Sequence, residues 1–162
     1  MQLKTNFLPE LQQKIDESIA RSTHTAQYPK PVAGLGSTKK SRTYYYDPSI
    51  VVPYAILDAD GKLLVPPGTT VNPLDTVSLS QALLFIDARD TAQVKRASGI
   101  LDEHGGKLKV ILTGGSYLDL MRRWKRPVFF DQQGTLTEKL GIRHVPALVT
   151  QDGKRLRIEE IP

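Results

Sequence analysis

The spacing of apolar residues near the N-terminus predicts a helix followed by a linker. Within residues 1–21, apolar side chains recur at three- and four-residue spacings, at Leu8, Leu11, Ile15 and Ile19. This spacing is typical of one face of an amphipathic helix. We expect the stripe to contact a partner or a second copy or, alternatively, to fold back onto a β-rich region formed by residues 43–81. Residues 22–42 combine prolines, glycines and polar residues with few large apolar ones, which predicts a linker.

The next part of the chain, residues 43–81, alternates short β-like runs with turn residues. Tyrosines and aliphatic residues form runs of three or four, separated by proline, glycine and aspartate, as in short strands. The segment Asp58–Gly61 suits the loop of a hairpin between Tyr54–Leu57 and Lys62–Val65. These residues are therefore expected to form a small β-rich extension.

From residue 82 onwards, apolar runs at regular intervals predict strands. Leu83–Ile86 is a continuous apolar run, which is typical of a central strand buried on both faces. Further strands are expected within residues 107–113, 128–130, 145–150 and 155–161. The last two flank Asp152-Gly153, a pair typical of a hairpin turn.

Helices are predicted between these strands from capping residues and periodic apolar positions. Asp90 and Ser116 each precede a helical pattern, and Thr135 forms a third capping pair with Glu138. The helices are expected to end near Gly105, before Pro127 and at Gly141. Residues 82–162 are therefore predicted to form an α/β domain that ends in an antiparallel hairpin.

The composition excludes several classes of protein. The chain has 162 residues, 40% of them hydrophobic and 24% charged, as is usual for globular proteins. Its longest apolar run, Ile50–Leu57, contains Pro53 and is far shorter than the ~20 residues of a membrane-spanning helix. No such helix is expected. The chain has no cysteine, which excludes disulfide bonds, thiol redox chemistry and thiolate metal sites.

The charge is modestly basic and says little about partners. The formal net charge is +5, and residues 82–162 carry 14 basic against 10 acidic side chains. Residues Met1–Thr5 lack the apolar segment of a signal peptide. The chain is expected to be either cytoplasmic or an exported protein whose signal has been removed.

No residue pattern predicts a catalytic, cofactor-binding or metal-binding site. Gly34–Ser41 has the glycines, lysines and serine of a phosphate-binding loop, but neither its spacing nor its flanking elements. His24, His104 and His144 are too scattered to be metal ligands. No catalytic residue, cofactor or metal ligand is therefore expected from these motifs.

Two charged clusters have an ordinary and a functional interpretation. Arg122–Arg126 holds four cations around Trp124, which suits a solvated helix end or, alternatively, contact with an acidic protein. Asp87, Asp90 and Asp131 follow predicted strands, where α/β proteins often place functional residues. Helix capping and turn formation explain Asp90 and Asp131 equally well.

The C-terminal half resembles the thioredoxin fold around one proline. Residues 140–149, followed by Asp152–Lys154, are similar to the stretch of that fold that carries a cis-proline before its hairpin. The resemblance predicts a cis peptide bond between Val145 and Pro146. Where thioredoxins have two cysteines, this chain has Asp90-Thr91-Ala92-Gln93. A thioredoxin-like domain without a redox centre is therefore expected.

Longer strings resemble the TraW family of F-type conjugative type IV secretion systems. They are Tyr46–Pro53, Val71–Leu79 and the run from Gly141 to Ile161, and the resemblance covers about residues 31–162. It implies a periplasmic, non-enzymatic protein, exported with a cleaved signal, that assembles the pilus and stabilises mating pairs. It also implies docking to another transfer protein such as TrbC.

Two other functions remain possible at this point. One is a thioredoxin-fold chaperone or enzyme that acts on polypeptides near Pro146 without thiol chemistry. The other is a cytoplasmic basic protein that binds nucleic acid, with steeply salt-dependent affinity.

The thioredoxin resemblance also predicts a docking surface near the C-terminus. A thioredoxin-like domain normally continues into a helix that covers one face of its sheet, whereas the last predicted strand here runs to the end of the chain. An uncovered apolar face would be a docking site. Its candidate residues are Val145, Pro146, Leu148, Leu156 and Ile158. The alternative is that the β-rich region or the first helix covers this face.

Overall fold

A computed structural model describes residues 29–162 of the chain. The helix and apolar stripe predicted within residues 1–21 lie outside the described residues. The strands are β1 (Gly36–Ser37), β2 (Arg42–Tyr46), β3 (Ile50–Val51), β4 (Ile56–Leu57), β5 (Leu63–Val65), β6 (Thr70–Val71), β7 (Ala82–Asp87), β8 (Leu108–Gly114), β9 (Phe129–Phe130), β10 (His144–Val145), β11 (Ala147–Asp152) and β12 (Arg155–Glu160). The helices are α2 (Thr91–Glu103), α3 (Tyr117–Trp124) and α4 (Thr135–Lys139), with short 3₁₀ turns at Pro73–Asp75 and Gln132–Gly134.

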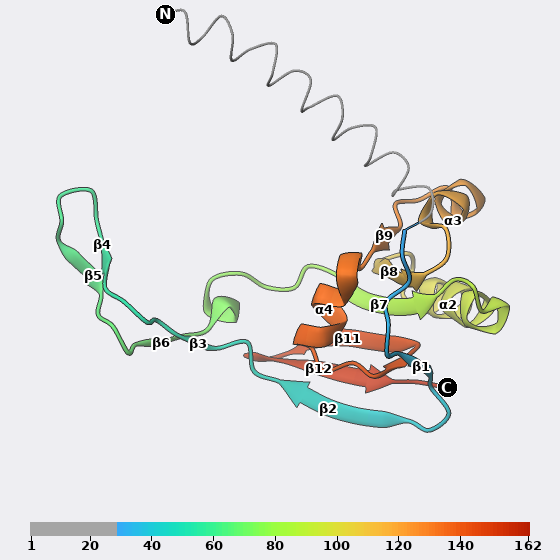
Figure 1. Cartoon of the computed structure of the whole chain (residues 1–162), viewed down its shortest axis with the longest axis horizontal. Coiled ribbons are helices and arrows are strands. Elements are labelled where there is room, and N and C mark those ends of the chain that lie inside the picture. The colour runs from blue at the N-terminus through green and yellow to red at the C-terminus, as the bar shows by residue number, and fades with distance from the viewer. Residues whose placement is uncertain (1–28) are drawn as a thin grey trace, which may run out of the picture.

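A six-stranded mixed sheet organises the molecule (Figure 1), in the order β2-β12-β11-β7-β8-β9. Strands β7, β8 and β9 are parallel, and β11, β12 and β2 are antiparallel to their neighbours. Helix α2 makes the crossover from β7 to β8, as parallel neighbours require. The predicted α/β class is confirmed.

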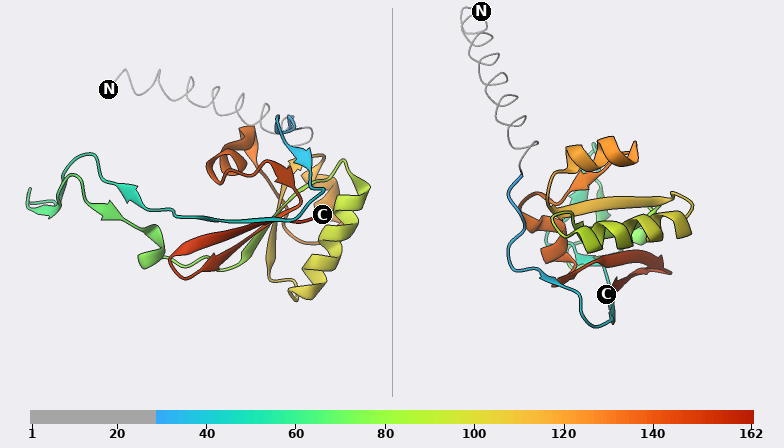
Figure 2. Two further views of the ribbon diagram at one scale, coloured as in Figure 1. Left: turned by 90° about the horizontal axis from the view of Figure 1, so that it is seen from below. Right: turned by 90° about the vertical axis from the view of Figure 1, so that its right-hand side faces the viewer.

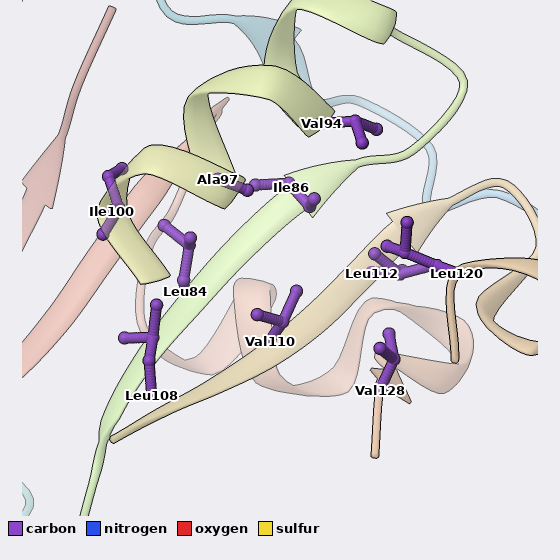
Figure 3. Close-up of a cluster of buried hydrophobic side chains, with 10 residues drawn as sticks. All are labelled: Leu84, Ile86, Val94, Ala97, Ile100, Leu108, Val110, Leu112, Leu120 and Val128. Carbon is purple, nitrogen blue, oxygen red and sulfur yellow. The ribbon is translucent and has the colours of Figure 1, made fainter. Parts of the chain in front are cut away.

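The central strands are buried on both faces, as their continuous apolar runs predict. In β7, the consecutive residues Leu84, Phe85 and Ile86 are all fully buried. Figure 3 shows Leu84 and Ile86 on the side of the sheet that α2 covers with Ala97 and Ile100. Phe85 faces the other side and packs in a second cluster. Each such side chain contributes about 1.5–3 kcal/mol by leaving water.

Two of the three predicted helix caps are confirmed, and the third is wrong. The Asp90 carboxylate accepts a hydrogen bond from the Ala92 N–H (3.0 Å), and the Ser116 hydroxyl accepts one from the Asp119 N–H (3.2 Å). For α4, predicted to start with a Thr135–Glu138 pair, the cap is the buried Asp131. Its carboxylate accepts hydrogen bonds from the N–H groups of residues 136 and 137 (2.9 and 3.0 Å). Asp131 precedes α4 by four residues, which is farther than a usual N-cap residue. The intervening 3₁₀ turn, Gln132–Gly134, places its carboxylate at the first N–H groups of the helix.

The predicted cis peptide bond between Val145 and Pro146 is confirmed. It lies between β10 and the hairpin β11–β12, whose turn contains Gly153 with a φ of +63°. Strands β8, β7, β11 and β12 adjoin in that order in the sheet. Membership of that fold family stays a prediction.

The N-terminal boundary of the main domain differs from the expected one. Residues up to 42 were predicted to be a linker, and residues 43–81 a separate extension. Instead, β1 pairs with β10, and β2 is an edge strand of the main sheet beside β12. The short β1 contact uses main-chain hydrogen bonds, from Gly36 N–H to the Arg143 carbonyl and from Thr38 N–H to the Val145 carbonyl (both 2.9 Å). Main-chain hydrogen bonds do not depend on the pattern of apolar side chains, so this pairing could not be predicted from that pattern.

Residues 47–79 form an arm that projects away from the sheet (Figures 1 and 2). It contains two short antiparallel pairs, β3 with β6 and β4 with β5, which confirms the predicted hairpin at Asp58–Gly61. Its base is tied to the β11–β12 turn, since the Asn72 side chain donates to the Lys154 carbonyl (2.7 Å) and Lys154 pairs with Asp75 (3.1 Å). The arm therefore leaves the domain at one end of β2.

Candidate functional site

The arm exposes an unusual amount of apolar side chain. Val52 of the arm is buried, but nine of its large apolar residues are between 38% and 71% exposed. They are Ile50, Val51, Tyr54, Ile56, Leu57, Leu63, Leu64, Val71 and Val77. Neighbouring residues of a strand point to opposite faces, so the exposure of both Ile50 and Val51 leaves both faces of β3 uncovered. Contiguous exposed apolar surface of this kind marks a site of interaction with another macromolecule.

The arm ends in an ordered, acidic turn. The Asp58 carboxylate accepts hydrogen bonds from the N–H groups of Asp60 (2.9 Å) and Lys62 (2.8 Å), and Gly61 supplies a φ of +81°. Over residues 47–79 there are four aspartates and one lysine, which makes a formal charge of −3. The rest of residues 29–162 is basic, so the arm and the domain carry opposite charges.

A basic hollow lies at the other end of β2. It has a volume of about 680 Å³ and is lined by Gly36, Ser37, Lys39, Lys40, Ser41, Arg42, His144 and Glu160. The segment between β1 and β2 forms one wall, and the residues before Pro146 form another. Three of the eight lining residues are lysine or arginine, against one carboxylate.

The floor of this hollow is the buried carboxylate of Glu160, which is 1% exposed. It accepts hydrogen bonds from the Arg42 guanidinium (2.8 Å) and from the N–H groups of Arg143 (2.9 Å) and His144 (3.0 Å). Burial alone would raise the pKa of Glu160, but these donors together lower it below its ordinary value. Glu160 therefore joins β2, β12 and the segment before β10 into one unit.

Acidification is expected to weaken the fold through Glu160. Because its pKa is lower in the folded chain than the ordinary 4.5, its contribution is fully present above that value and is lost as the pH falls through the folded pKa. We expect the free energy of unfolding, from urea titrations between about pH 5 and pH 3, to fall more steeply for the wild-type chain than for Glu160→Gln. Glu159→Gln should keep the wild-type profile, and parallel profiles for wild type and Glu160→Gln would contradict this assignment.

The docking surface predicted around Pro146 is largely covered by the chain itself. Val145 (2% exposed) and Ile158 (fully buried) lie in the second core cluster, packed with Leu140 and Ile142 and against Leu35. They were expected on an open face, and this is wrong, because the segment leading into β1 and the residues around α4 supply the missing cover. Pro146 is also buried, and Leu148 and Leu156 are partly buried.

The other candidate residues serve structural purposes. His104 Nδ1 lies 2.9 Å from the Ile100 carbonyl at the end of α2. In the basic cluster, Arg126 donates to the Leu108 carbonyl (2.6 Å), which joins α3 to β8. Asp87 forms an ion pair with Arg89 (2.8 Å). Among residues 29–162, no three potential ligands are grouped so that they could hold a metal ion.

The helices were also compared with the requirements for crossing a membrane. None in residues 29–162 has both the length and the apolar character to cross a bilayer.

Comparison with known proteins identifies the family. Protein TraW of Escherichia coli strain K12 is 35% identical to this chain over 158 residues, which covers 94% of the chain and 73% of that protein. The chain belongs to the TraW family. This confirms the resemblance found in the sequence and supports, at that coarser level, a role related to conjugative transfer.

The other two comparisons add nothing to TraW family membership. No family model matches the chain, and no solved structure matches it. The base of the arm and two residues of the hollow, His144 and Glu160, lie in the TraW-like strings of the sequence. Neither the arm nor the hollow was expected as a site. The apolar run of Ile50–Leu57 was the signal for the arm, because so long a run beside prolines and aspartates cannot all be core.

Proposed function

We propose that this protein is a non-enzymatic assembly factor of a conjugative type IV secretion system. In this role it acts in the periplasm, helps to assemble the pilus and to stabilise mating pairs, and docks to another transfer protein such as one like TrbC. Membership of the TraW family supports this proposal. The structural observation that carries it is the projecting arm, whose strands pair only with one another among the strands of residues 29–162.

The energetics of the arm favour a docking element. Two-stranded ribbons are marginally stable alone, and neither pair of the arm, β3–β6 or β4–β5, is part of the main sheet. A partner that covered its apolar side chains would gain about 25 cal/mol for each Å² removed from water. Aromatic and aliphatic anchors such as Tyr54, 71% exposed, are the residues that usually dominate such interfaces.

The alternative of a polypeptide-binding chaperone or enzyme at Pro146 has less support. The backbone of residues 143–145, which an extended peptide would pair with, is already paired with β1 of the same chain. The Thr38 hydroxyl also donates to the Pro146 carbonyl (3.2 Å). A peptide would have to displace this segment before it could bind there.

Co-purification tests the partner assignment. When the chain is co-expressed in the periplasm with a TrbC-like protein from the same transfer system, we expect the two to co-purify. The double variant Ile50→Ser/Val51→Ser should lose at least about tenfold of the captured partner, because two exposed anchors are removed without a change of charge. Phe129→Ser/Leu136→Ser, on exposed apolar residues outside the arm, is the matched control. Equal capture by both variants would contradict docking through the arm.

A further inference from the structure

We propose that the acidic tip of the arm of one copy binds in the basic hollow of a second copy, so that the chain associates head to tail. This inference rests on the proposed function, since it assigns a partner to the distal part of the same arm. The base of the arm, around β3 and β6, stays available to a different transfer protein.

The hollow has an excess of positive charge at its rim. The carboxylate of Glu160 is buried and already bound by Arg42, so it does not neutralise the other cations. Lys39 and Lys40 are exposed and form no ion pair with any residue in 29–162. An occupant of this hollow is therefore expected to carry negative charge.

The arm tip has the complementary chemistry. Asp60 is exposed, and its carboxylate has no ion pair within the described part of the chain. It stands beside apolar side chains that need cover, such as Leu57 and Leu64, which are 54% and 60% exposed. A hollow of about 680 Å³ lies within the usual range of binding pockets, roughly 300–1,000 Å³. The tip of a two-stranded hairpin, whose strands are about 5 Å apart, is narrow enough for such a site.

The geometry makes this contact intermolecular. The hollow includes Arg42, the first residue of β2, whereas the arm begins after Tyr46, the last residue of β2. Figures 1 and 2 show the arm and β1 at opposite ends of the molecule. The tip therefore cannot reach the hollow of its own chain. Two different surfaces that bind each other in this way join copies into a ring or an open filament.

Unpaired strand edges add to the complementarity. Strand β2 is an edge of the main sheet, and β4 and β5 form a sheet of only two strands. Their outer main-chain groups are open to pairing with another chain. A tip seated beside the start of β2 can thus gain main-chain hydrogen bonds as well as ion pairs.

Sedimentation velocity of chain 1–162 over a range of concentrations tests the proposal. We expect reversible, concentration-dependent association that weakens with salt, because the screening length shortens from about 10 Å at 0.1 M to about 3 Å at 1 M. Asp60→Lys should weaken association by about tenfold or more, since it places like charges together. Lys39→Glu/Lys40→Glu should do the same. Asp58 is left intact because its carboxylate holds the turn.

A mixture of the two variants is the decisive measurement. Neither variant is expected to associate with itself. In the mixture, the basic tip of Asp60→Lys can bind the acidic hollow of Lys39→Glu/Lys40→Glu. The native acidic tip of Lys39→Glu/Lys40→Glu can likewise bind the native basic hollow of Asp60→Lys. Mixing them should restore association to near the wild-type level. Lys107→Glu/Lys139→Glu, which makes the same charge change at exposed lysines elsewhere, should associate like wild type.

Two outcomes would overturn the inference: a chain that stays monomeric at every concentration, or a mixture that does not recover. Failure here is distinguishable from failure of the proposed function. If the chain is monomeric but the Ile50→Ser/Val51→Ser variant still loses the TrbC-like partner, only self-association is refuted. If the chain associates but that variant retains the partner, the proposed docking function is refuted instead.

Discussion

Conjugative DNA transfer is expected to fall by about two to three orders of magnitude when Ile50 and Val51 are both replaced by serine. Both side chains are more than half exposed, at 58% and 62%, on opposite faces of the arm. If each is an interface anchor worth about 2 kcal/mol, the pair accounts for about a thousandfold in affinity. The measurement is mating frequency in a donor that lacks its own copy of the gene and is complemented with the variant.

The same variant should fold like the wild-type chain, because exposed positions tolerate polar residues within about 0.5 kcal/mol. Its thermal unfolding and its level in the donor cells check this point. Phe129→Ser/Leu136→Ser, with 45% and 40% exposed side chains outside the arm, should transfer DNA normally. A normal mating frequency for Ile50→Ser/Val51→Ser at equal protein level would refute the role of the arm.

The second large effect is expected on stability, from Glu160→Ala. This change leaves the N–H groups of Arg143 and His144 without their acceptor and removes the carboxylate that holds Arg42. Breaking a buried charged pair costs about 3–5 kcal/mol, and the half-exposed Arg42 side chain can recover some hydration. We therefore expect a loss of about 3 kcal/mol and a melting temperature lower by about 10 °C, followed by circular dichroism.

The neighbouring residue provides a matched control. Glu159 pairs with Arg157 (2.7 Å) but is 26% exposed, and exposed ion pairs contribute at most about 1 kcal/mol. Glu159→Ala should therefore stay within about 1 kcal/mol of wild type. If both alanine variants lost the same small free energy of unfolding, Glu160 would not be the residue that holds β2, β12 and the segment before β10 together.

The sequence by itself determined the elements whose signals are local. The apolar run at Leu83–Ile86 marks a strand buried on both faces, and Asp90 and Ser116 cap the helices that they precede. The hairpin at Asp58–Gly61, the cis bond before Pro146 and TraW family membership could also be predicted. Each of these depends on residues within a few positions of one another, or on strings that the family shares.

Only the tertiary structure decided which strands pair across long stretches of chain, and therefore which apolar residues are covered. The run that contains Tyr44 looks like any short strand in the sequence. No neighbouring residue indicates that this strand pairs with β12, more than a hundred residues away. For the same reason the sequence gives no sign that Glu160, which follows another glutamate, is buried. In the structure it is bound by Arg42, Arg143 and His144 from distant segments. Ile158 and Ile50 look alike in the sequence, yet one is fully buried and the other is 58% exposed. An apolar pattern measures the tendency of a residue to leave water, and the fold decides whether its own chain or a partner provides the cover.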